Sequence, residues 1–216
     1  RAAAEERERL LARLQQSLAA QRRFVADASH ELKTPLTAIS GMAEMLRTGR
    51  ADASPEQREK ALRTIEAEID KMARLVSDLL TLSKSSEAEA PLLARTSIDV
   101  RALIESATAS AQDAISNGRL RLVEFPQMTV EGDADMLSRA IRNLVDNALA
   151  YSPPTGTVTV RAESANAEAV IEVIDEGPGI SAEDLPRVFD RFYRADASRS
   201  RQTGGAGLGL PIVAAI

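Results

Sequence analysis

The chain has 216 residues, of which 44% are hydrophobic and 27% are charged, so a packed core with a well-solvated surface is expected. It contains no cysteine and a single histidine, His30, which excludes disulfides, thiolate metal sites and a multi-histidine metal site within one chain. Only 3% of the residues are aromatic and the net charge is -5, so neither a base-stacking surface nor a strongly basic nucleic-acid-binding surface is expected.

Residues 5–47 are predicted to form one long helix, roughly 60 Å in length at about 1.5 Å per residue. Its apolar residues follow a heptad pattern that Gln21 and Pro35 interrupt. The pattern comprises Leu18, Val25, Ala28, Leu32, Ile39, Met42 and Leu46. Pro35 lies well inside the helix and is predicted to bend it, and the sequence offers no packing reason for a proline there.

A turn is predicted over residues 48–55, followed by a second helix with Ser54 as its N-cap and Pro55 in its first position. The apolar residues of this helix alternate at spacings of three and four, at Leu62, Ile65, Ile69, Met72, Val76 and Leu79. Two helices that each carry one apolar stripe and share a short turn predict a hairpin, which is half of a four-helix bundle completed by a symmetric dimer. A plain coiled-coil spacer is the alternative, and the stripe alone favours it.

His30 falls at heptad position f, the position farthest from the stripe, and is therefore expected to face solvent. Glu31 is its neighbour, and Thr34 lies on the same helix face one turn later. A neutral imidazole is a competent nucleophile, and a carboxylate that accepts the N–H of its second nitrogen orients the ring and raises its basicity. Glu31 is placed for that role; a solvated surface histidine is the alternative on these residues alone.

A polar stretch over residues 83–97 predicts a linker, with a domain boundary near residue 90. Beyond it, the hydrophobic pattern predicts helices and short strands, namely helices over 99–116 and 133–150 and strands over 119–124, 127–131, 157–163 and 169–175. A long loop over 176–207, with a helical turn near 183–188, leads into a last helix. Loops of this length in compact domains are more often functional than accidental.

Two patches in this second half have polar side chains suited to a ligand. Asn143 and Asn147 share one face of a helix, and paired amide oxygens can orient a hydrated Mg²⁺, although solvated side chains are the simpler interpretation. The segment DEGPGI at 175–180 follows a strand. It is either a tight turn or a site in which Asp175 accepts a hydrogen bond from an exocyclic amine such as adenine N6.

Two further patches suit phosphate groups. The segment FDRFYR at 189–194 concentrates aromatic residues in a loop that also holds Arg187, Arg191, Arg194, Arg199 and Arg201. Cations in such a loop suit a polyphosphate. The segment GGAGLGL at 204–210 runs into a helix, where glycine-rich backbone can bind an anion, but a lone glycine loop is a weak signal.

Taken in chain order, these segments resemble the sequence boxes of bacterial two-component sensor histidine kinases. SHELKTPL at 29–36 resembles the H box, NLVDNA at 143–148 the N box, DEGPGI at 175–180 the G1 box, FDRFYR at 189–194 the F box, and GGAGLGL at 204–210 the G2 box. Five boxes in the same order and at similar spacing make the resemblance specific, and it extends from about residue 10 to the end of the chain.

The resemblance implies a fold of two modules, an α-helical hairpin that forms a dimeric four-helix bundle and an α/β sandwich of the Bergerat type, as in histidine kinases and Hsp90-like ATPases. Residues 1–20 are then the end of a HAMP signalling helix, 21–85 the dimerisation and histidine phosphotransfer domain, 86–96 a linker, and 97–216 a catalytic ATP-binding domain truncated at its C-terminus. The implied partners are a second copy of the chain and a cognate response regulator, with no nucleic acid. The implied location is the cytoplasmic portion of a bacterial inner-membrane protein.

The activity implied by this resemblance is Mg²⁺- and ATP-dependent autophosphorylation of His30, followed by transfer to an aspartate of the response regulator. Glu31 matches the acid/base partner, Thr34 the position linked to dephosphorylation of the regulator, and Asn143 and Asn147 the magnesium-binding face. Tyr151 and Asp175 match adenine-pocket positions. The remaining ATP-binding positions, at the ends of the nucleotide lid and at the phosphates, are Gly177, Gly179, Arg194, Gly205, Gly207, Leu208 and Gly209.

The chain departs from the family pattern in two places. Ala150 stands where many members carry lysine or arginine, so phosphate binding is expected to depend more on the arginines of the long loop. The family domain continues past the position that matches Ile216, so an inactive fragment is the alternative for this chain. Two other classes of protein fit these residues less well. An ATPase of the chaperone or topoisomerase kind lacks the segment at 29–36, and a non-enzymatic scaffold does not need the N, G1 and G2 residues.

Overall fold

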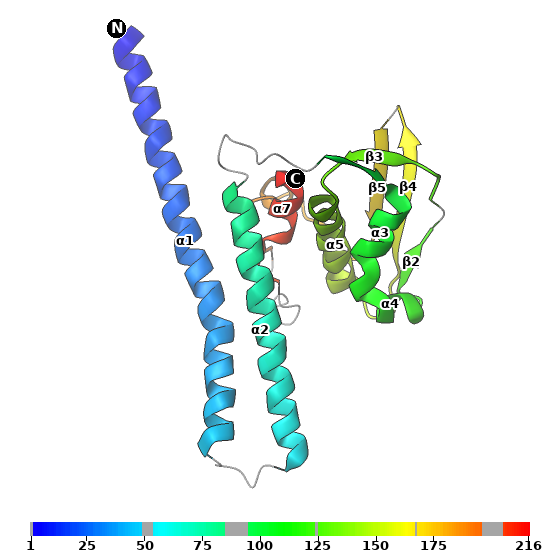
Figure 1. The fold of residues 1–216 in the computed structure, drawn as a ribbon. Helices are drawn as coiled ribbons and strands as arrows, with labels where there is room; N and C mark the ends of the chain where they lie inside the picture. The colour runs from blue at the N-terminus through cyan, green and yellow to red at the C-terminus, as the bar shows by residue number, and fades with distance from the viewer. Residues whose placement is uncertain (1, 49–53, 85–94, 124, 167, 196–204) are drawn as a thin grey trace. The chain divides into compact units, whose positions relative to one another are not determined.

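The computed structural model describes residues 2–48, 54–84, 95–123, 125–166, 168–195 and 205–216 (Figure 1). It contains two compact units, residues 1–79 and 80–216. The division falls inside the second long helix, whereas the polar composition of residues 83–97 had suggested a boundary beyond that helix.

The first unit is the predicted helical hairpin, formed by α1 (Ala2–Thr48) and α2 (Pro55–Lys84) (Figure 1). A reciprocal capping box starts α2, because Gln57 N–H donates to Ser54 Oγ at 3.3 Å and Ser54 N–H donates to Gln57 Oε1 at 3.1 Å. The predicted N-cap at Ser54 is thereby confirmed. Helix α1 runs through Pro35 without interruption, and this side chain is fully buried. Pro35 therefore has the packing role that the sequence did not reveal.

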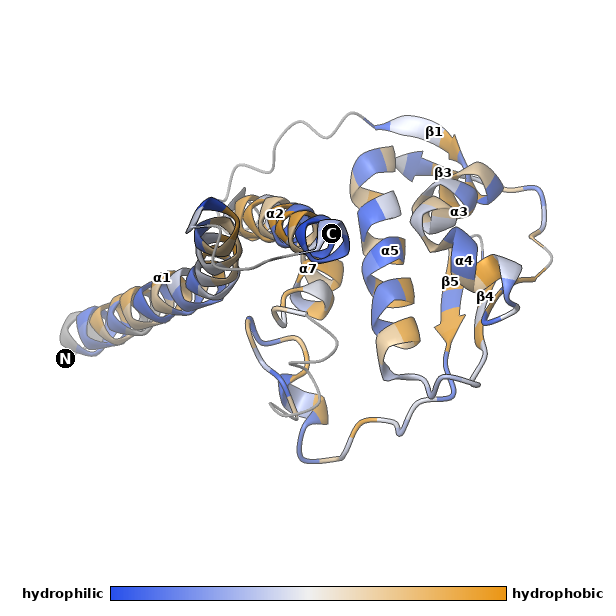
Figure 2. Cartoon of the chain, turned by 90° about the horizontal axis from the view of Figure 1, so that it is seen from below, coloured by the Kyte–Doolittle hydropathy of each residue, from blue (hydrophilic) through white to orange (hydrophobic). Residues whose placement is uncertain are grey.

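The apolar stripe of α2 is only partly covered within one chain. Ile65, Met72 and Leu79 of the stripe are half-buried, and Ala61 and Leu75 beside it are buried at 3% and 5% exposure. Leu62, Ile69 and Val76, which are spaced seven residues apart, remain 48%, 51% and 44% exposed. Hydrophobic and hydrophilic residues alternate along both long helices (Figure 2). A continuous row of apolar side chains on the hairpin is thus left facing solvent.

The second unit contains β1 (Thr96–Asp99), α3 (Val100–Thr108), η1 (Ala109–Ala111), α4 (Gln112–Ser116), β2 (Leu120–Leu122), β3 (Thr129–Gly132), α5 (Ala134–Tyr151), β4 (Val158–Ala165), β5 (Glu168–Ile174), η2 (Leu185–Arg187) and α7 (Gly209–Ala215). Strand β1 pairs antiparallel with β3, and a second sheet has the order β2-β4-β5. Strands β2 and β4 are parallel, and the crossover that parallel pairing requires carries α5. The fold is the expected α/β type; strand β1, which the sequence did not predict, is the main addition.

Helices α3 and α5 cover the sheets with a shared apolar core. Each begins at an aspartate cap, with Ala102 N–H donating to Asp99 Oδ1 at 2.8 Å and Met136 N–H donating to Asp133 Oδ1 at 3.1 Å. The core includes residues exposed by 2% or less, namely Val100, Ile104, Leu120, Val145, Val158 and Val160. Helix α5 lies between this core and α7 (Figures 1 and 2).

The two ends of the second unit are also anchored. At the start, Leu82 in the last turn of α2 is 1% exposed, and Arg139 Nη1 donates to Thr81 Oγ1 at 2.6 Å. At the end, Leu208 and Ile212 are 1% and 0% exposed where α7 packs on α5. Helix α5 is therefore held on both of its flanks, which gives the polar residues on its remaining face a fixed support.

Replacing Ile104 with alanine should destabilise the second unit by about 2–5 kcal/mol, because the deleted methyl and methylene groups leave a cavity in a fully buried position. Chemical denaturation followed by circular dichroism measures this free energy of unfolding. Ser106→Ala on the exposed face of the same helix is the matched control and is expected to change stability by less than about 0.5 kcal/mol. A similar stability for both variants would contradict the assigned core.

Candidate nucleotide and phosphotransfer site

One face of α5 carries three of the predicted site residues at intervals of four. Asn143 is half-buried, Asn147 is exposed, and Tyr151 is 43% exposed. Residues four apart lie on the same helix face, and the eight-residue span from Asn143 to Tyr151 corresponds to about 12 Å along the axis. This face is therefore long enough to bind an extended ligand, with Asn143 contacting one end of the ligand and Tyr151 the other.

At one end of this face, Asn143 meets the glycine-rich segment before α7. A Cβ atom added at Gly209 would lie 3.8 Å from Asn143 Cβ and 3.9 Å from Asn143 Oδ1, so the two residues are direct neighbours. The Nδ2 atom of Asn143 is buried and has no hydrogen-bond partner among the residues that the structure describes. Because buried amide groups are nearly always hydrogen-bonded, this orphaned group indicates a place for an external polar ligand.

At the other end, Tyr151 meets the turn after β5. Gly177 N–H donates to Asp175 Oδ1 at 2.7 Å. A Cβ atom added at Gly177 would lie 2.6 Å from Asp175 Oδ1 and 3.3 Å from the Tyr151 carbonyl oxygen, so only glycine fits between them. The Asp175 side chain is exposed, and its Oδ2 atom adds a second acceptor to the one that the turn uses. The turn thus brings Asp175 and Gly177 next to the backbone of Tyr151.

Glu176 holds this turn in place, although the sequence did not identify it as a site residue. Its Oε2 atom accepts a hydrogen bond at 3.0 Å from the backbone N–H of Thr157, just before β4. The turn is therefore tied to the start of the neighbouring strand as well as to the end of β5. Gly179, with φ of +73°, follows in the left-handed conformation that favours glycine.

The glycine-rich segment is joined to the predicted F box through its backbone. Phe192 N–H donates to the Gly207 carbonyl oxygen at 2.9 Å, and Gly207 has φ of +71°. Gly205 is exposed. Leu208 is only 1% exposed, so its side chain belongs to the packed interior and is not available to a ligand. A contact between Leu208 and ATP stays a prediction.

The loop arginines are less available than the sequence suggested. The Arg187 guanidinium lies 4.2 Å from the centroid of the Tyr193 ring, and Arg191 Nη2 donates to the Leu82 carbonyl oxygen at 3.2 Å. Arg194 is half-buried. Arg199 and Arg201 lie outside the described residues. At least two of the five arginines, Arg187 and Arg191, thus interact with other residues of the chain. The sequence, in contrast, predicts a cluster of arginines that is available to a polyphosphate.

The predicted phosphoacceptor lies in the first unit. His30 is exposed on α1, as its heptad position predicted, and Glu31 beside it is half-buried. Thr34 Oγ1 donates to the His30 carbonyl oxygen at 3.4 Å, which places its hydroxyl one turn from the imidazole on the same helix. Exposure leaves the imidazole accessible to a reaction partner.

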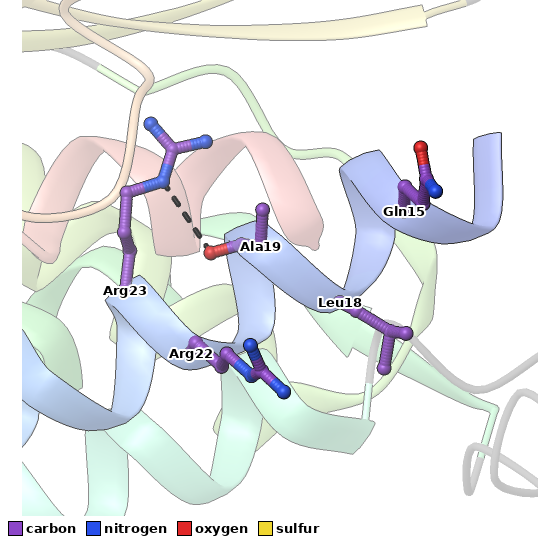
Figure 3. Close-up of a pocket in the computed structure, with 5 residues that line it drawn as sticks. All are labelled: Gln15, Leu18, Ala19, Arg22 and Arg23. Carbon is purple, nitrogen blue, oxygen red and sulfur yellow. Dashed lines mark hydrogen bonds between the residues drawn. The ribbon is translucent and has the colours of Figure 1, made fainter. Parts of the chain in front are cut away.

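A surface hollow on α1 does not bring residues from different elements together. It is lined by Gln15, Leu18, Ala19, Arg22 and Arg23, and Arg23 Nε donates to the Ala19 carbonyl oxygen at 3.4 Å (Figure 3). Every lining residue comes from α1, so the hollow is the groove between successive turns of one helix. Within the described residues, no group of three or more His, Cys, Asp or Glu side chains gathers as a metal site.

Comparison with known protein families identifies both units. The "His Kinase A (phospho-acceptor) domain" family matches residues 20–88, and the "Histidine kinase-, DNA gyrase B-, and HSP90-like ATPase" family matches residues 132–216. The first match contains His30, and the second contains the whole polar face of α5 with both glycine segments. The candidate phosphoacceptor therefore lies in one matched domain, and the candidate nucleotide site lies in the other.

Similar proteins point the same way. The chain is 40% identical over 196 residues to the probable sensor histidine kinase TcrY of Mycobacterium tuberculosis, covering 90% of this chain and 40% of that protein. It is 38% identical over 192 residues to the phosphate regulon sensor protein PhoR of Pseudomonas aeruginosa, covering 88% and 43%. The structure of the Acinetobacter baumannii histidine kinase AdeS is similar with a TM-score of 0.64 at 26% identity, covering 86% of this chain and 84% of that one. The chain thus spans less than half the length of the two relatives named by sequence.

Proposed function

Because the chain belongs to the sensor histidine kinase family, we propose that it transfers the γ-phosphoryl group of ATP to its own His30 and then to an aspartate of a response regulator. Two features found in one chain support this proposal. The region that matches the phospho-acceptor domain carries the exposed imidazole of His30, and the region that matches the ATPase domain carries the unpartnered amide of Asn143 beside a glycine-rich segment.

The residues of this chain supply each part of the transfer. A lone pair on a His30 ring nitrogen attacks the γ-phosphorus, an N–P bond forms, and the bond from phosphorus to the β,γ-bridging oxygen breaks so that ADP leaves with the electron pair. The imidazole, now cationic, loses the proton on its second nitrogen to Glu31. In phosphoryl transfer of this kind, positioning and charge neutralisation supply most of the rate enhancement.

ATP is proposed to lie along the polar face of α5. Asp175 accepts a hydrogen bond from the adenine amine, with Tyr151 beside the ring, and the triphosphate lies toward Gly205–Gly209. The unpartnered Nδ2 group of Asn143 fits this placement, since it needs a hydrogen-bond acceptor and a phosphate oxygen provides one. Asn143 and Asn147 would hold Mg²⁺, which neutralises phosphate charge when it is bound.

We further propose that Thr34 takes part in dephosphorylation of the regulator. Its hydroxyl lies one helical turn from His30 and is exposed, so it can orient a water molecule near the phosphoryl group without blocking the imidazole. The response regulator and anchorage of the complete protein in the bacterial plasma membrane stay predictions from the family relationship. In the described part of the chain, no helix combines the length and the apolar character that a membrane span requires.

The hairpin is proposed to form a homodimer through its uncovered apolar row, Leu62, Ile69 and Val76. Ile69→Asp should then weaken dimerisation by about 100-fold or more, because each of two copies loses an apolar contact and gains a buried charge. Sedimentation equilibrium measures the dissociation constant. Arg74→Gln, an exposed change on the opposite side of α2, is the control and should leave dimerisation unchanged. An Ile69→Asp chain that stays fully dimeric would contradict this interface.

The proposed function is tested by incubating the chain with Mg²⁺ and ATP labelled on the γ-phosphate. Protein-bound phosphate that is acid-labile and alkali-stable is expected, since phosphoramidates and phosphoesters differ in these stabilities. ATP turnover without any protein-bound phosphate would favour an ATPase of the chaperone or topoisomerase class. A chain that binds no nucleotide would favour a signalling scaffold.

A further inference from the structure

Two contacts hold the side chain of Tyr193, one of only two tyrosines in the chain. Its hydroxyl donates to Asp184 Oδ1 at 2.6 Å. The Arg187 guanidinium stacks over its ring at 4.2 Å from the centroid, a distance typical of a cation–π contact. A half-buried side chain with both its polar end and its ring face engaged is well fixed in orientation.

Asp184, the acceptor of this bond, is itself held from the other side. Ser181 Oγ donates to Asp184 Oδ2 at 2.7 Å, and Asp184 N–H donates to Ser181 Oγ at 3.1 Å. The hydrogen bonds from Tyr193 and then Ser181 lower the pKa of the Asp184 carboxyl, and the bond to Asp184 raises the pKa of the Tyr193 hydroxyl. Around neutral pH the aspartate is therefore ionised and the tyrosine protonated, which preserves the bond.

The backbone of Phe192 and Tyr193 packs directly against Gly207 in the glycine-rich segment. Phe192 N–H donates to the Gly207 carbonyl oxygen at 2.9 Å. A Cβ atom added at Gly207 would lie 2.9 Å from both the Phe192 carbonyl carbon and the Tyr193 carbonyl oxygen. Phe192 has φ of +62°, a left-handed conformation that a phenylalanine rarely adopts and that surrounding contacts must hold.

We propose that Tyr193, held by Asp184 and Arg187, is a positioning residue that fixes the backbone of Phe192 and Tyr193 against Gly207 and so shapes the glycine-rich segment for the triphosphate of ATP. This inference rests on the proposed function. The path of contacts is continuous, from the Tyr193 side chain to its own backbone, to Gly207, and along the segment to Gly209 beside Asn143. The adenine end of the site, at Asp175 and Tyr151, takes no part in it.

The test is the Tyr193→Phe variant, which removes the hydroxyl and keeps the ring. Calorimetric titration with Mg²⁺ present should show affinity for ATP reduced by about tenfold, the lower end of the effect of one lost hydrogen bond to a charged acceptor, and affinity for adenosine unchanged. Asp184→Ala, which leaves no acceptor for the Tyr193 hydroxyl, should act similarly, and the double variant should be no weaker than either single variant, because both changes remove the same interaction.

Two controls separate positioning from general stability. Glu172→Gln removes a salt bridge with Arg161 on the β4-β5 hairpin and should leave both affinities unchanged. Ultraviolet titration of tyrosine ionisation should show the pKa of Tyr193 falling toward its ordinary range in Asp184→Ala, since the hydrogen bond that raises this pKa is lost.

Equal losses of ATP and adenosine affinity in Tyr193→Phe, or no loss of either, would overturn the positioning role while leaving the proposed function intact. A wild-type chain that binds no ATP would overturn both. A loss confined to ATP supports the proposal.

Discussion

Replacing Asp175 with asparagine is expected to weaken ATP binding by about 30- to 100-fold, which is the cost of losing a charged acceptor and facing the adenine amine with a second donor. The substitution is nearly isosteric. Its remaining side-chain oxygen can still accept the 2.7 Å bond from Gly177 N–H, so the turn after β5 should keep its shape. The loss therefore reports on recognition of the base and not on folding. Calorimetric titration with ATP measures it.

A matched control comes from the same loop. Glu183→Gln removes one exposed carboxylate without touching the turn, so ATP affinity should change by less than about twofold. The free energy of unfolding should be the same for both variants. Unchanged ATP affinity in Asp175→Asn would show that other residues recognise the adenine and would contradict the assignment of Asp175 to the adenine end of the site.

The His30→Gln variant should show no acid-labile protein-bound phosphate, while its ATP affinity stays within about twofold of the wild type. Glutamine is polar and tolerated on an exposed helix surface, but its amide has no nucleophilic lone pair comparable to that of imidazole. Because His30 is the only histidine in the chain, no other imidazole can replace it. Labelled ATP and filter-bound phosphate counting, combined with titration calorimetry, separate the two effects.

Neighbouring hydroxyl groups provide the controls for this variant. Ser29 Oγ donates to the Val25 carbonyl oxygen at 2.7 Å and Thr34 Oγ1 to the His30 carbonyl oxygen at 3.4 Å. Ser29→Ala and Thr34→Ala should both retain acid-labile phosphate. Persistence of this phosphate in His30→Gln would contradict the assigned phosphoacceptor.

Much of the fold followed from local patterns. The heptad spacing predicted both long helices, and Ser54 was identified as the cap of α2 because serine before proline is a local signal. Strand β1 was missed since Thr96–Asp99 is short, and its pairing partner β3 lies some thirty residues away. The burial of Pro35 was missed for the same reason: a packing role depends on a neighbour that the local sequence does not contain.

The candidate site was predictable where its residues lie in recognisable segments. Helix spacing placed Asn143 and Asn147 on one face, the position after a strand indicated the Gly177 turn, and the family resemblance alone pointed to Tyr151. The roles of Glu176 and Asp184 were not predictable, because each depends on a contact with another segment, at Thr157 and at Tyr193. Charge counting likewise could not show that Arg187 stacks on an aromatic ring.

The most direct measurement is to identify the chemical form and position of phosphate on the wild-type chain after reaction with Mg²⁺ and ATP. Phosphorus NMR of the denatured product and fragmentation mass spectrometry of its peptides provide both. The expected result is a single phosphoramidate on the imidazole of His30. A phosphoester on serine or threonine, or ADP formation with an unmodified chain, would contradict the account.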